Sequence, residues 1–213
     1  MTPEQKQRII LSQRDAFKRN GYHPHALFWS SREVQEIRFK IIADIGIGAN
    51  ANGRDSILDV GCGFGDFAAY LERQNISTSY TGIDISADLL AEGRRQYPDL
   101  KLLQADLFEF DPKPQSFDYV TLSGTLNRKF MGNNGAQSAK DYSLEVIKRM
   151  FASCKKGIAF NLLDARHQWT ADRWDLQSFY PDEILQVIKQ LTRNYRLIDT
   201  YLENDFTIHA WRV

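Results

Sequence analysis

Apolar residues follow two different patterns after residue 55, and the two patterns alternate along the chain. Short continuous apolar runs predict buried strands, whereas apolar residues at intervals of three and four predict helices. The strands are expected at 56–60, 79–84, 100–104, 117–122 and 157–163, and the helices at 66–74, 87–96 and 137–153. Strands and helices that alternate in this order build a parallel sheet covered by helices on both faces.

The end of the chain has a different pattern. A helix at about 182–192 is followed by two β-rich runs, 195–203 and 206–213, with only the turn-like Asn204-Asp205 between them. Two strands this close in sequence pair as an antiparallel hairpin. The sequence therefore predicts an α/β fold of three layers, with a mostly parallel seven-stranded sheet and an antiparallel C-terminal hairpin.

Two helices are expected before the sheet begins. The dipeptide Thr2-Pro3 is a typical helix start and Gly21 a typical stop, which predicts a helix over residues 3–19. Its polar character suggests that it covers a surface of the core.

A second helix begins with the capping box formed by Ser30 and Glu33. Its apolar residues repeat at helical spacing, and we expect it to end near Gly46. Residues 1–50 are therefore predicted to be a helical segment that packs on the core as a lid. Residues 51–213 are predicted to be that core, in one domain overall.

The bulk composition limits the class of protein and its partners. A chain of 213 residues with 43% hydrophobic content is expected to fold around one core. It carries 27 basic and 27 acidic residues, whereas a protein that grips nucleic acid along its backbone has a basic surplus. We therefore expect no nucleic-acid partner, with only a local basic patch left open.

Membrane and metal partners are not expected either. No stretch approaches the roughly 20 apolar residues of a membrane-spanning helix, and the first residues lack the apolar core of a signal peptide. We therefore expect a cytoplasmic protein. Cys62 and Cys154 are too few and too far apart for a disulfide framework, and no ligand pattern accompanies His23 and His25.

A glycine-rich loop, Asp59-Val60-Gly61-Cys62-Gly63-Phe64-Gly65, follows the first predicted strand directly. In an open parallel sheet, ligands bind beyond the carboxyl ends of the strands, so a nucleotide-like cofactor is expected at this loop. The dinucleotide fingerprint needs a glycine at its sixth position, where this chain has Asp66. A carboxylate there opposes a pyrophosphate at the helix N-terminus, which weighs against a nicotinamide dehydrogenase.

The same loop resembles the first motif of the class I S-adenosylmethionine-dependent methyltransferases, an acidic residue and any residue before Gly-x-Gly-x-Gly. Asp59 to Gly65 matches every position. The resemblance implies a Rossmann-like core, with S-adenosylmethionine as cofactor and S-adenosylhomocysteine as product. It also implies that Gly61 and Gly63 let the backbone approach the methionine part, while Asp59 serves its ammonium group directly or through water. Cys62 and Gly65 belong to the expected cofactor site as members of this loop.

Two further carboxylates follow the next predicted strands. Asp84 ends the second strand, about 20 residues after the glycine loop, where a carboxylate accepts hydrogen bonds from ribose hydroxyls. The resemblance implies that Asp106, after the third strand, accepts from the adenine amino group, with Ile85 and Leu107 against the ring. Ser123 follows the fourth strand and is expected at the same cofactor. Taken alone, Asp84 and Asp106 are better explained as solvated loop carboxylates, and it is their combination with the glycine loop that favours the cofactor site.

Arg38 falls inside the apolar stripe of the second predicted helix, where a charge needs a partner. Two interpretations stay open. The side chain reaches solvent or pairs with a core carboxylate. Alternatively, because several members of the family place an arginine of an N-terminal helix on the methionine carboxylate, Arg38 binds the cofactor.

The expected acceptor site is built from aromatic and loop residues. Tyr22 and Trp29 lie in an aromatic segment that could close the cleft, and Asn127 lies in the loop after the fourth strand. Trp169 and Tyr180 are suited to covering a planar or apolar acceptor, although packing under the loop explains them equally well. The Pro-Pro motif of many base amino-methyltransferases is absent after the fourth strand, which argues against that reaction.

Methyl transfer depends mainly on alignment in a dry cavity, and a general base is optional. His167 and Asp164 are the candidates for such a base, with an ordinary exposed histidine as the other interpretation of His167. The predicted function is O- or N-methylation of a small organic acceptor. The alternatives are a protein or RNA methyltransferase and a non-catalytic binding module with the same fold, and the oligomeric state is not readable from the sequence.

Overall fold

The computed structural model describes residues 1–49, 54–129 and 135–212. Within these residues one sheet has the strand order β3-β2-β1-β4-β5-β8-β7, with β6 paired to the end of β5. The strands are β1 (Asp55–Val60), β2 (Thr78–Asp84), β3 (Lys101–Gln104), β4 (Phe117–Leu122), β5 (Cys154–Asp164), β6 (Ser178–Phe179), β7 (Tyr195–Ile198) and β8 (Asp205–Trp211). The sequence pattern also predicts a flexible glycine- and asparagine-rich loop at 129–137, which lies largely outside the described residues.

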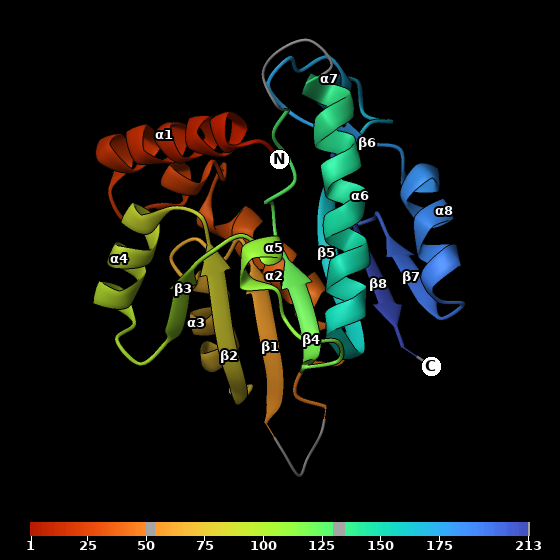
Figure 1. Ribbon diagram of the computed structural model, residues 1–213, viewed down its shortest axis with the longest axis horizontal. Helices are drawn as coiled ribbons and strands as arrows, with labels where there is room; N and C mark the ends of the chain where they lie inside the picture. Colours follow the sequence, from red (N-terminus) through yellow and green to blue (C-terminus); the bar gives the residue numbers. More distant parts are fainter. Residues whose placement is uncertain (50–53, 130–134, 213) are drawn as a thin grey trace.

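Helices alternate with the parallel strands as the sequence pattern predicts. They are α1 (Pro3–Asn20), the 3-10 helix η1 (Pro24–Leu27), α2 (Arg32–Ala43), α3 (Asp66–Arg73), α4 (Ala87–Gln96), α5 (Leu107–Phe110), α6 (Gly135–Ser153), α7 (Gln168–Ala171) and α8 (Pro181–Leu191). Helices α6 and α8 lie on one face of the sheet and α2 and α3 on the other, which gives three layers (Figure 1).

The sheet is parallel from β3 to β5 and antiparallel at its C-terminal edge. β1 pairs in parallel with β2 and β4, whereas β8 runs antiparallel to both β5 and β7. The predicted α/β, Rossmann-like sandwich with an antiparallel end is therefore confirmed. The described sheet has eight strands rather than seven because the two-residue strand β6 adds to β5 beside Leu163 and Asp164.

Two local predictions were wrong. The hairpin does not turn at Asn204-Asp205, because β7 already ends at Ile198 and Asp205 is the first residue of β8. The second helix begins one residue later than expected, since the Ser31 hydroxyl, not Ser30, accepts the hydrogen bond from the Val34 amide. Of the two, only the strand start has a distant partner in the structure, since Asp205 pairs with the buried Arg38.

Two groups of buried side chains hold the layers together, one on each face of the sheet. Alternate residues of β1 belong to different groups. Leu58 and Val60 face α6 and α8, whereas Ile57 faces α2 and α3. Burial of these side chains removes apolar surface from water on both faces, which is the main favourable term for folding. The sheet therefore fixes where its carboxyl ends lie.

The N-terminal helices lie beside those carboxyl ends. In Figure 1, α1 lies at the upper left, above α4 and the arrowhead of β2. Between α1 and α2 runs a segment that we call the strap, residues 21–31, which includes η1. The lid predicted for residues 1–50 thus corresponds to α1, the strap and α2, while its independence from the core stays untested.

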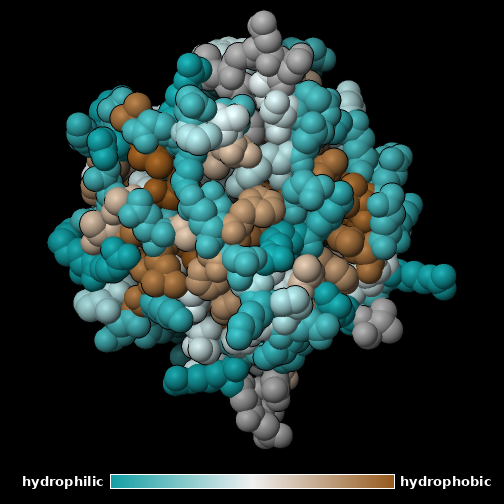
Figure 2. Space-filling view, viewed as in Figure 1, coloured by the Kyte–Doolittle hydropathy of each residue, from teal (hydrophilic) through white to brown (hydrophobic). Residues whose placement is uncertain are grey.

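The outer surface is largely polar. Figure 2 shows one face on which hydrophobic side chains lie in separate patches among hydrophilic ones. Among the described helices, none combines the length and the apolar character needed to cross a membrane.

Candidate functional site

A cavity of about 310 Å³ lies at the carboxyl ends of β1, β2, β3 and β4. Its volume is at the lower end of the range for small-molecule sites. It is lined by most of the predicted cofactor residues: Asp59, Gly61, Cys62, Gly63, Asp84, Ile85, Asp106, Leu107 and Ser123. The carboxyl ends of four neighbouring parallel strands, β3, β2, β1 and β4, therefore bring these residues together, as the strand order requires.

The glycines of the loop between β1 and α3 are needed for close packing. Gly61, Gly63 and Gly65 all have positive φ. A Cβ on Gly61 would lie 2.0 Å from the Thr125 hydroxyl oxygen, and one on Gly63 would lie 2.9 Å from a methyl carbon of Leu27. The glycines thus let Thr125 and Leu27 pack directly against the loop backbone, while Gly61 and Gly63 also line the cavity.

Asp59 is buried at the base of the cavity, with 4% of its surface exposed. Its carboxylate accepts hydrogen bonds from the Tyr80 hydroxyl at 2.6 Å and the Thr121 hydroxyl at 2.9 Å. Burial raises the pKa of Asp59 to about 6, although the two hydrogen bonds oppose this shift. A cation placed beside this carboxylate would stabilise its ionised form.

Asp84 holds the glycine loop in place. Its carboxylate accepts hydrogen bonds from the backbone N–H of Gly63 at 2.9 Å and of Ser86 at 2.8 Å. Burial raises the pKa of Asp84, and these backbone donors oppose the shift. The end of β2 and the glycine loop are consequently one connected unit.

Asp106 has a different environment. One carboxylate oxygen caps α5 by accepting from the amides of Phe108 and Glu109, both at 2.9 Å. The other lies 3.3 Å from the ammonium group of Lys6 on α1. Asp106 therefore reaches the cavity as a helix cap that also anchors the first helix.

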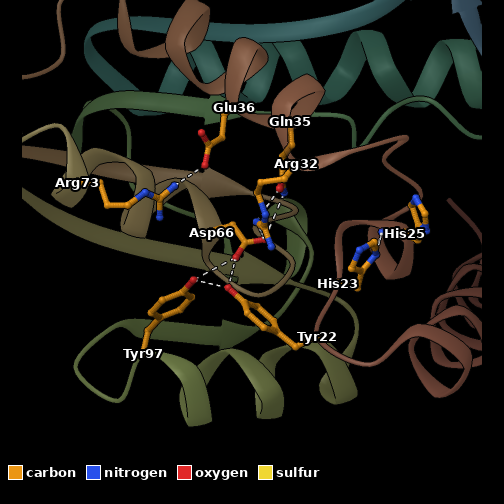
Figure 3. Close-up of polar contacts among 9 residues, drawn as sticks. All are labelled: Tyr22, His23, His25, Arg32, Gln35, Glu36, Asp66, Arg73 and Tyr97. Atoms are coloured by element: carbon orange, nitrogen blue, oxygen red, sulfur yellow. Dashed lines mark hydrogen bonds and ion pairs between the residues drawn. The ribbon is translucent and has the colours of Figure 1, made fainter.

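The strap is fastened to the core by Asp66, the first residue of α3. The Asp66 carboxylate forms an ion pair with Arg32 at 2.9 Å and accepts hydrogen bonds from the Tyr22 hydroxyl at 2.8 Å and the Gln35 amide at 3.3 Å. The Tyr97 hydroxyl of the α4 end also donates to it, at 3.2 Å. Figure 3 shows these side chains converging on Asp66 from three separate segments. The residue that breaks the dinucleotide fingerprint is thus the anchor of the strap.

The strap also contacts the cavity wall directly. Leu27 packs on Gly63, and a Cβ on Gly124 would lie 2.5 Å from the ring of Trp29. Trp29 lines the cavity and stacks on the Arg38 guanidinium, 4.6 Å from the ring centroid. The aromatic strap therefore forms part of the cavity boundary, as the sequence predicts for Trp29.

Arg38 follows the first of the two interpretations left open. It is buried and forms an ion pair with Asp205 at the start of β8, and it does not line the cavity. Burial raises the pKa of Asp205 to about 6 while Arg38 lowers it. Because its charge is already paired, we leave Arg38 out of the cofactor site proposed below.

The two candidate bases also lie apart from the cavity. Asp164 is buried and accepts two hydrogen bonds from Arg166 Nε, at 2.9 and 3.0 Å. His167 lies beside it, 3.9 Å from Glu203. Neither residue lines the cavity, so the structure gives no support to a catalytic role for either.

The predicted acceptor residues divide into two groups. Trp29 lines the cavity, whereas Tyr22, Asn127, Trp169 and Tyr180 do not. Tyr22 is bound to Asp66, and the Asn127 carbonyl accepts from the Gln177 amide. Gly65 of the loop also lies outside the lining, where it serves as the N-cap of α3.

Several cavity residues were missed. Arg8 of α1, Arg128 and Lys129 after β4, Tyr142 of α6 and Trp174 all line it. The polar face of α1 was interpreted as a surface cover, and nothing in its local pattern shows that the helix lies over the sheet. Trp174 belongs to the same aromatic stretch as the predicted Trp169 and Tyr180, but of these three residues it alone lines the cavity.

Comparisons with known proteins all find methyltransferases. Residues 57–157 match the family model described as "Methyltransferase domain". A Mycobacterium tuberculosis protein whose name suggests a methyltransferase is 26% identical over 161 residues, which is 75% of this chain and 94% of that protein. Trans-aconitate 2-methyltransferase of Escherichia coli O157:H7 is 33% identical over 72 residues, 34% of this chain but only 28% of that enzyme.

Solved structures share the whole fold at low sequence identity. Magnesium protoporphyrin IX methyltransferase from Synechocystis PCC 6803, with bound S-adenosylhomocysteine, has a TM-score of 0.68 at 12% identity and covers 98% of both chains. A methyltransferase from Archaeoglobus fulgidus has a TM-score of 0.63 at 14% identity, over 85% of this chain and 95% of that one. At such identities these structures support the fold.

Proposed function

Because the chain belongs to the class I S-adenosylmethionine-dependent methyltransferases and uses S-adenosylmethionine as its cofactor, we propose that it methylates an oxygen or nitrogen atom of a small organic acceptor. The observation that carries this proposal is the cavity. Its lining joins the glycine loop and three carboxylates to side chains from α1, the strap and α6. A cofactor and a small second molecule would therefore meet beneath α1.

The cofactor contacts proposed here start from the acidic residues of the cavity. Asp59 binds the ammonium group of the methionine part, and Asp84 accepts hydrogen bonds from the ribose hydroxyls. Asp106 lies toward the adenine, with Ile85 and Leu107 against its ring. Buried carboxylates with raised pKa values, such as Asp59 and Asp84, favour ligands that bring a cation or hydrogen-bond donors.

A polar atom at the cavity wall supports the presence of a ligand. The Ser123 hydroxyl lines the cavity, and its oxygen is buried without a hydrogen-bond partner among the described residues. A buried polar atom without a partner is costly, so a ligand that bonds to it gains affinity. Gln13 of α1 has a side-chain oxygen in the same condition.

S-adenosylmethionine supplies an electrophilic methyl group when it is bound. A lone pair on the acceptor atom forms the new bond to the methyl carbon while the carbon–sulfur bond breaks, and S-adenosylhomocysteine leaves. The residues of this chain align the reactants and exclude water, the function that we assign to Leu27 and Trp29 of the strap. The names of the relatives, a trans-aconitate and a magnesium protoporphyrin methyltransferase, agree with a small acceptor.

Turnover tests the proposal directly. The protein is incubated with S-adenosylmethionine and pools of small metabolites, and S-adenosylhomocysteine is measured against protein-free reactions. We expect at least one pool to support multiple turnovers, and the Asp84→Ala variant to lose the activity. Release that requires an added protein or RNA and occurs with none of the small-molecule pools would contradict a small acceptor.

A further inference from the structure

Three cationic side chains line the same cavity as the cofactor carboxylates. Arg8 comes from α1, and Arg128 and Lys129 come from the connection after β4. The three carboxylates that we assign to the cofactor come from different elements, the ends of β1 and β2 and the residue before α5. The cavity therefore carries both acidic and basic groups, and only the acidic ones have a role so far.

The protein's own carboxylates leave these cations largely available. Asp175 is the acidic residue beside them in the cavity lining, and both of its oxygens accept from Arg173, at 2.8 and 2.9 Å. Arg173 is the main cause of the lowered pKa of Asp175, whereas Arg128 lies 3.9 Å away. Arg8 forms no ion pair with any residue that the structure describes. Its charge is only the smallest of the causes that lower the pKa of the exposed Glu4, one turn earlier on α1.

Two of the cations are held in place by neutral partners. Arg128 donates to the Ser12 hydroxyl at 3.2 Å and stacks on Phe28, 4.7 Å from the ring centroid. Lys129 donates one ammonium proton to the Arg173 carbonyl at 2.7 Å, which leaves its other two protons for a ligand. These contacts hold both cations without neutralising them. Asp175, 3.9 Å from Arg128 and already bound by Arg173, neutralises only part of the Arg128 charge.

The wall around the cations is apolar and aromatic. Ile9 of α1, Leu126 and Val146 of α6 line the cavity, together with Phe28 and Trp174. Trp174 is 74% exposed, so a large flat apolar surface stands at the edge of the cavity without cover. A ligand with an apolar or aromatic body and one anionic group would match both features.

We propose that the acceptor carries a carboxylate, which Arg8 binds together with Arg128 or Lys129 while its apolar body packs toward Trp174. This inference rests on the proposed function and adds the chemical class of the acceptor. A guanidinium group presents two parallel N–H donors that match the two oxygens of a carboxylate, so recognition is directional as well as electrostatic.

The test compares carboxylates with neutral molecules of the same shape. Benzoate, cinnamate and 2-naphthoate, each beside its primary amide, are titrated calorimetrically into protein saturated with S-adenosylhomocysteine. We expect at least one acid to bind about tenfold or more tightly than its amide, the gain of one charge-assisted contact. If no acid binds more tightly than its amide, the proposal is overturned.

Arg8→Gln is the informative variant because Arg8 has no ion pair within the described protein to lose. We expect it to abolish most of the preference for the acid while leaving the affinity for S-adenosylhomocysteine unchanged. Arg19→Gln is the matched control, since Arg19 is exposed on the same helix and does not line the cavity. It should behave like the unsubstituted protein.

Three further results would each contradict a different part of this account. If Arg8→Gln weakens S-adenosylhomocysteine but not adenosine, Arg8 serves the cofactor's own carboxylate and the proposal is wrong. If the unsubstituted protein does not bind S-adenosylhomocysteine, the proposed function fails. Cofactor binding without any preference for acids would contradict the acceptor class alone.

Discussion

At the scale of single residues, Asp59 is both part of the glycine motif in the sequence and the carboxylate proposed to bind the ammonium group of the cofactor. It is the acidic residue that opens the glycine motif, and in the structure it is buried with Tyr80 and Thr121 as its hydrogen-bond donors. Its pKa of about 6 means that its charge changes close to neutral pH. A ligand cation at this carboxylate therefore has to compete with a proton.

This competition predicts a pH dependence of cofactor binding. As the pH falls through 6, Asp59 of the free protein takes up a proton. The ammonium group of the cofactor must displace this proton in order to bind. We expect the affinity for S-adenosylhomocysteine to be constant above pH 7 and to fall below pH 6, by at most tenfold per pH unit. Calorimetric titrations from pH 5 to 8 measure this. Asp59→Asn should bind weakly with a flatter profile, and an unchanged profile would contradict the role of Asp59.

Much of the proposed cofactor site could be predicted from the sequence, because its residues come directly after strands that the apolar pattern locates. Asp59, Asp84 and Asp106 were predicted in this way, and all three line the cavity. Arg8 was not predicted, because its position over the cavity depends on how α1 packs against the sheet. His167 was chosen for its chemistry, although no local pattern shows which way the segment after β5 faces.

At the scale of elements, the strap is the part whose structure depends most on distant contacts. Leu27 and Trp29 pack on glycines of two different loops, and Asp66 binds Tyr22 of the strap and Arg32, the first residue after it. Side chains of η1 and its neighbours thus cover part of the cavity. Leu27 and Trp29 are therefore part of the cavity wall.

A single hydroxyl tests the strength of this attachment. Tyr22→Phe removes the donor to Asp66 at 2.8 Å, which we expect to weaken the strap by about 1 kcal/mol. Trypsin should then cleave faster after Lys18 and Arg19, while the global unfolding free energy changes little. Tyr180→Phe is the control, since that side chain is exposed and lies outside the cavity. Equal cleavage rates for both variants would show that the hydrogen bond between Tyr22 and Asp66 does not hold the strap.

The longer elements were predicted well and the short ones poorly, for a physical reason. Helix α4 and strand β4 have the predicted bounds because each buries a full periodic face. Strand β6 has two residues, too few to show a period, and it forms only because β5 offers a free edge there. Ser30 and Ser31 are equally good caps by sequence, and the choice depends on the path of the strap.

At the scale of the whole molecule, an ion pair joins the two ends of the chain. Arg38 of α2 and Asp205 of β8 are 167 positions apart and both are buried. Asp205 also explains why the predicted turn failed, because a residue typical of turns is drawn into the sheet by a buried cation. The N-terminal segment is therefore bound to the core by charge as well as by apolar packing.

Breaking this pair predicts a loss of stability that depends on pH. Arg38→Met leaves a buried carboxylate unpaired, which costs about 3–5 kcal/mol when it is ionised. The folded pKa of Asp205 is raised above its unfolded value, and loss of Arg38 raises it further, so stability falls as the pH rises through the folded pKa. Urea unfolding should show a larger loss at pH 8 than at pH 5.

The double variant Arg38→Met/Asp205→Asn supplies the control for this prediction. It removes both charges, so we expect most of the pH-dependent loss to disappear. It should also bind S-adenosylhomocysteine normally, because Arg38 lies outside the cavity lining. Weaker binding by the double variant would instead favour the other interpretation of Arg38, contact with the cofactor.

The most direct measurement of the central claim is a calorimetric titration of the unsubstituted protein with S-adenosylhomocysteine, with NAD as the comparison ligand. We expect one site per chain for S-adenosylhomocysteine, no heat of binding for NAD, and loss of the site in Asp84→Ala. Binding of NAD in preference to S-adenosylhomocysteine would contradict the assignment of the cavity to a methyl-donor cofactor.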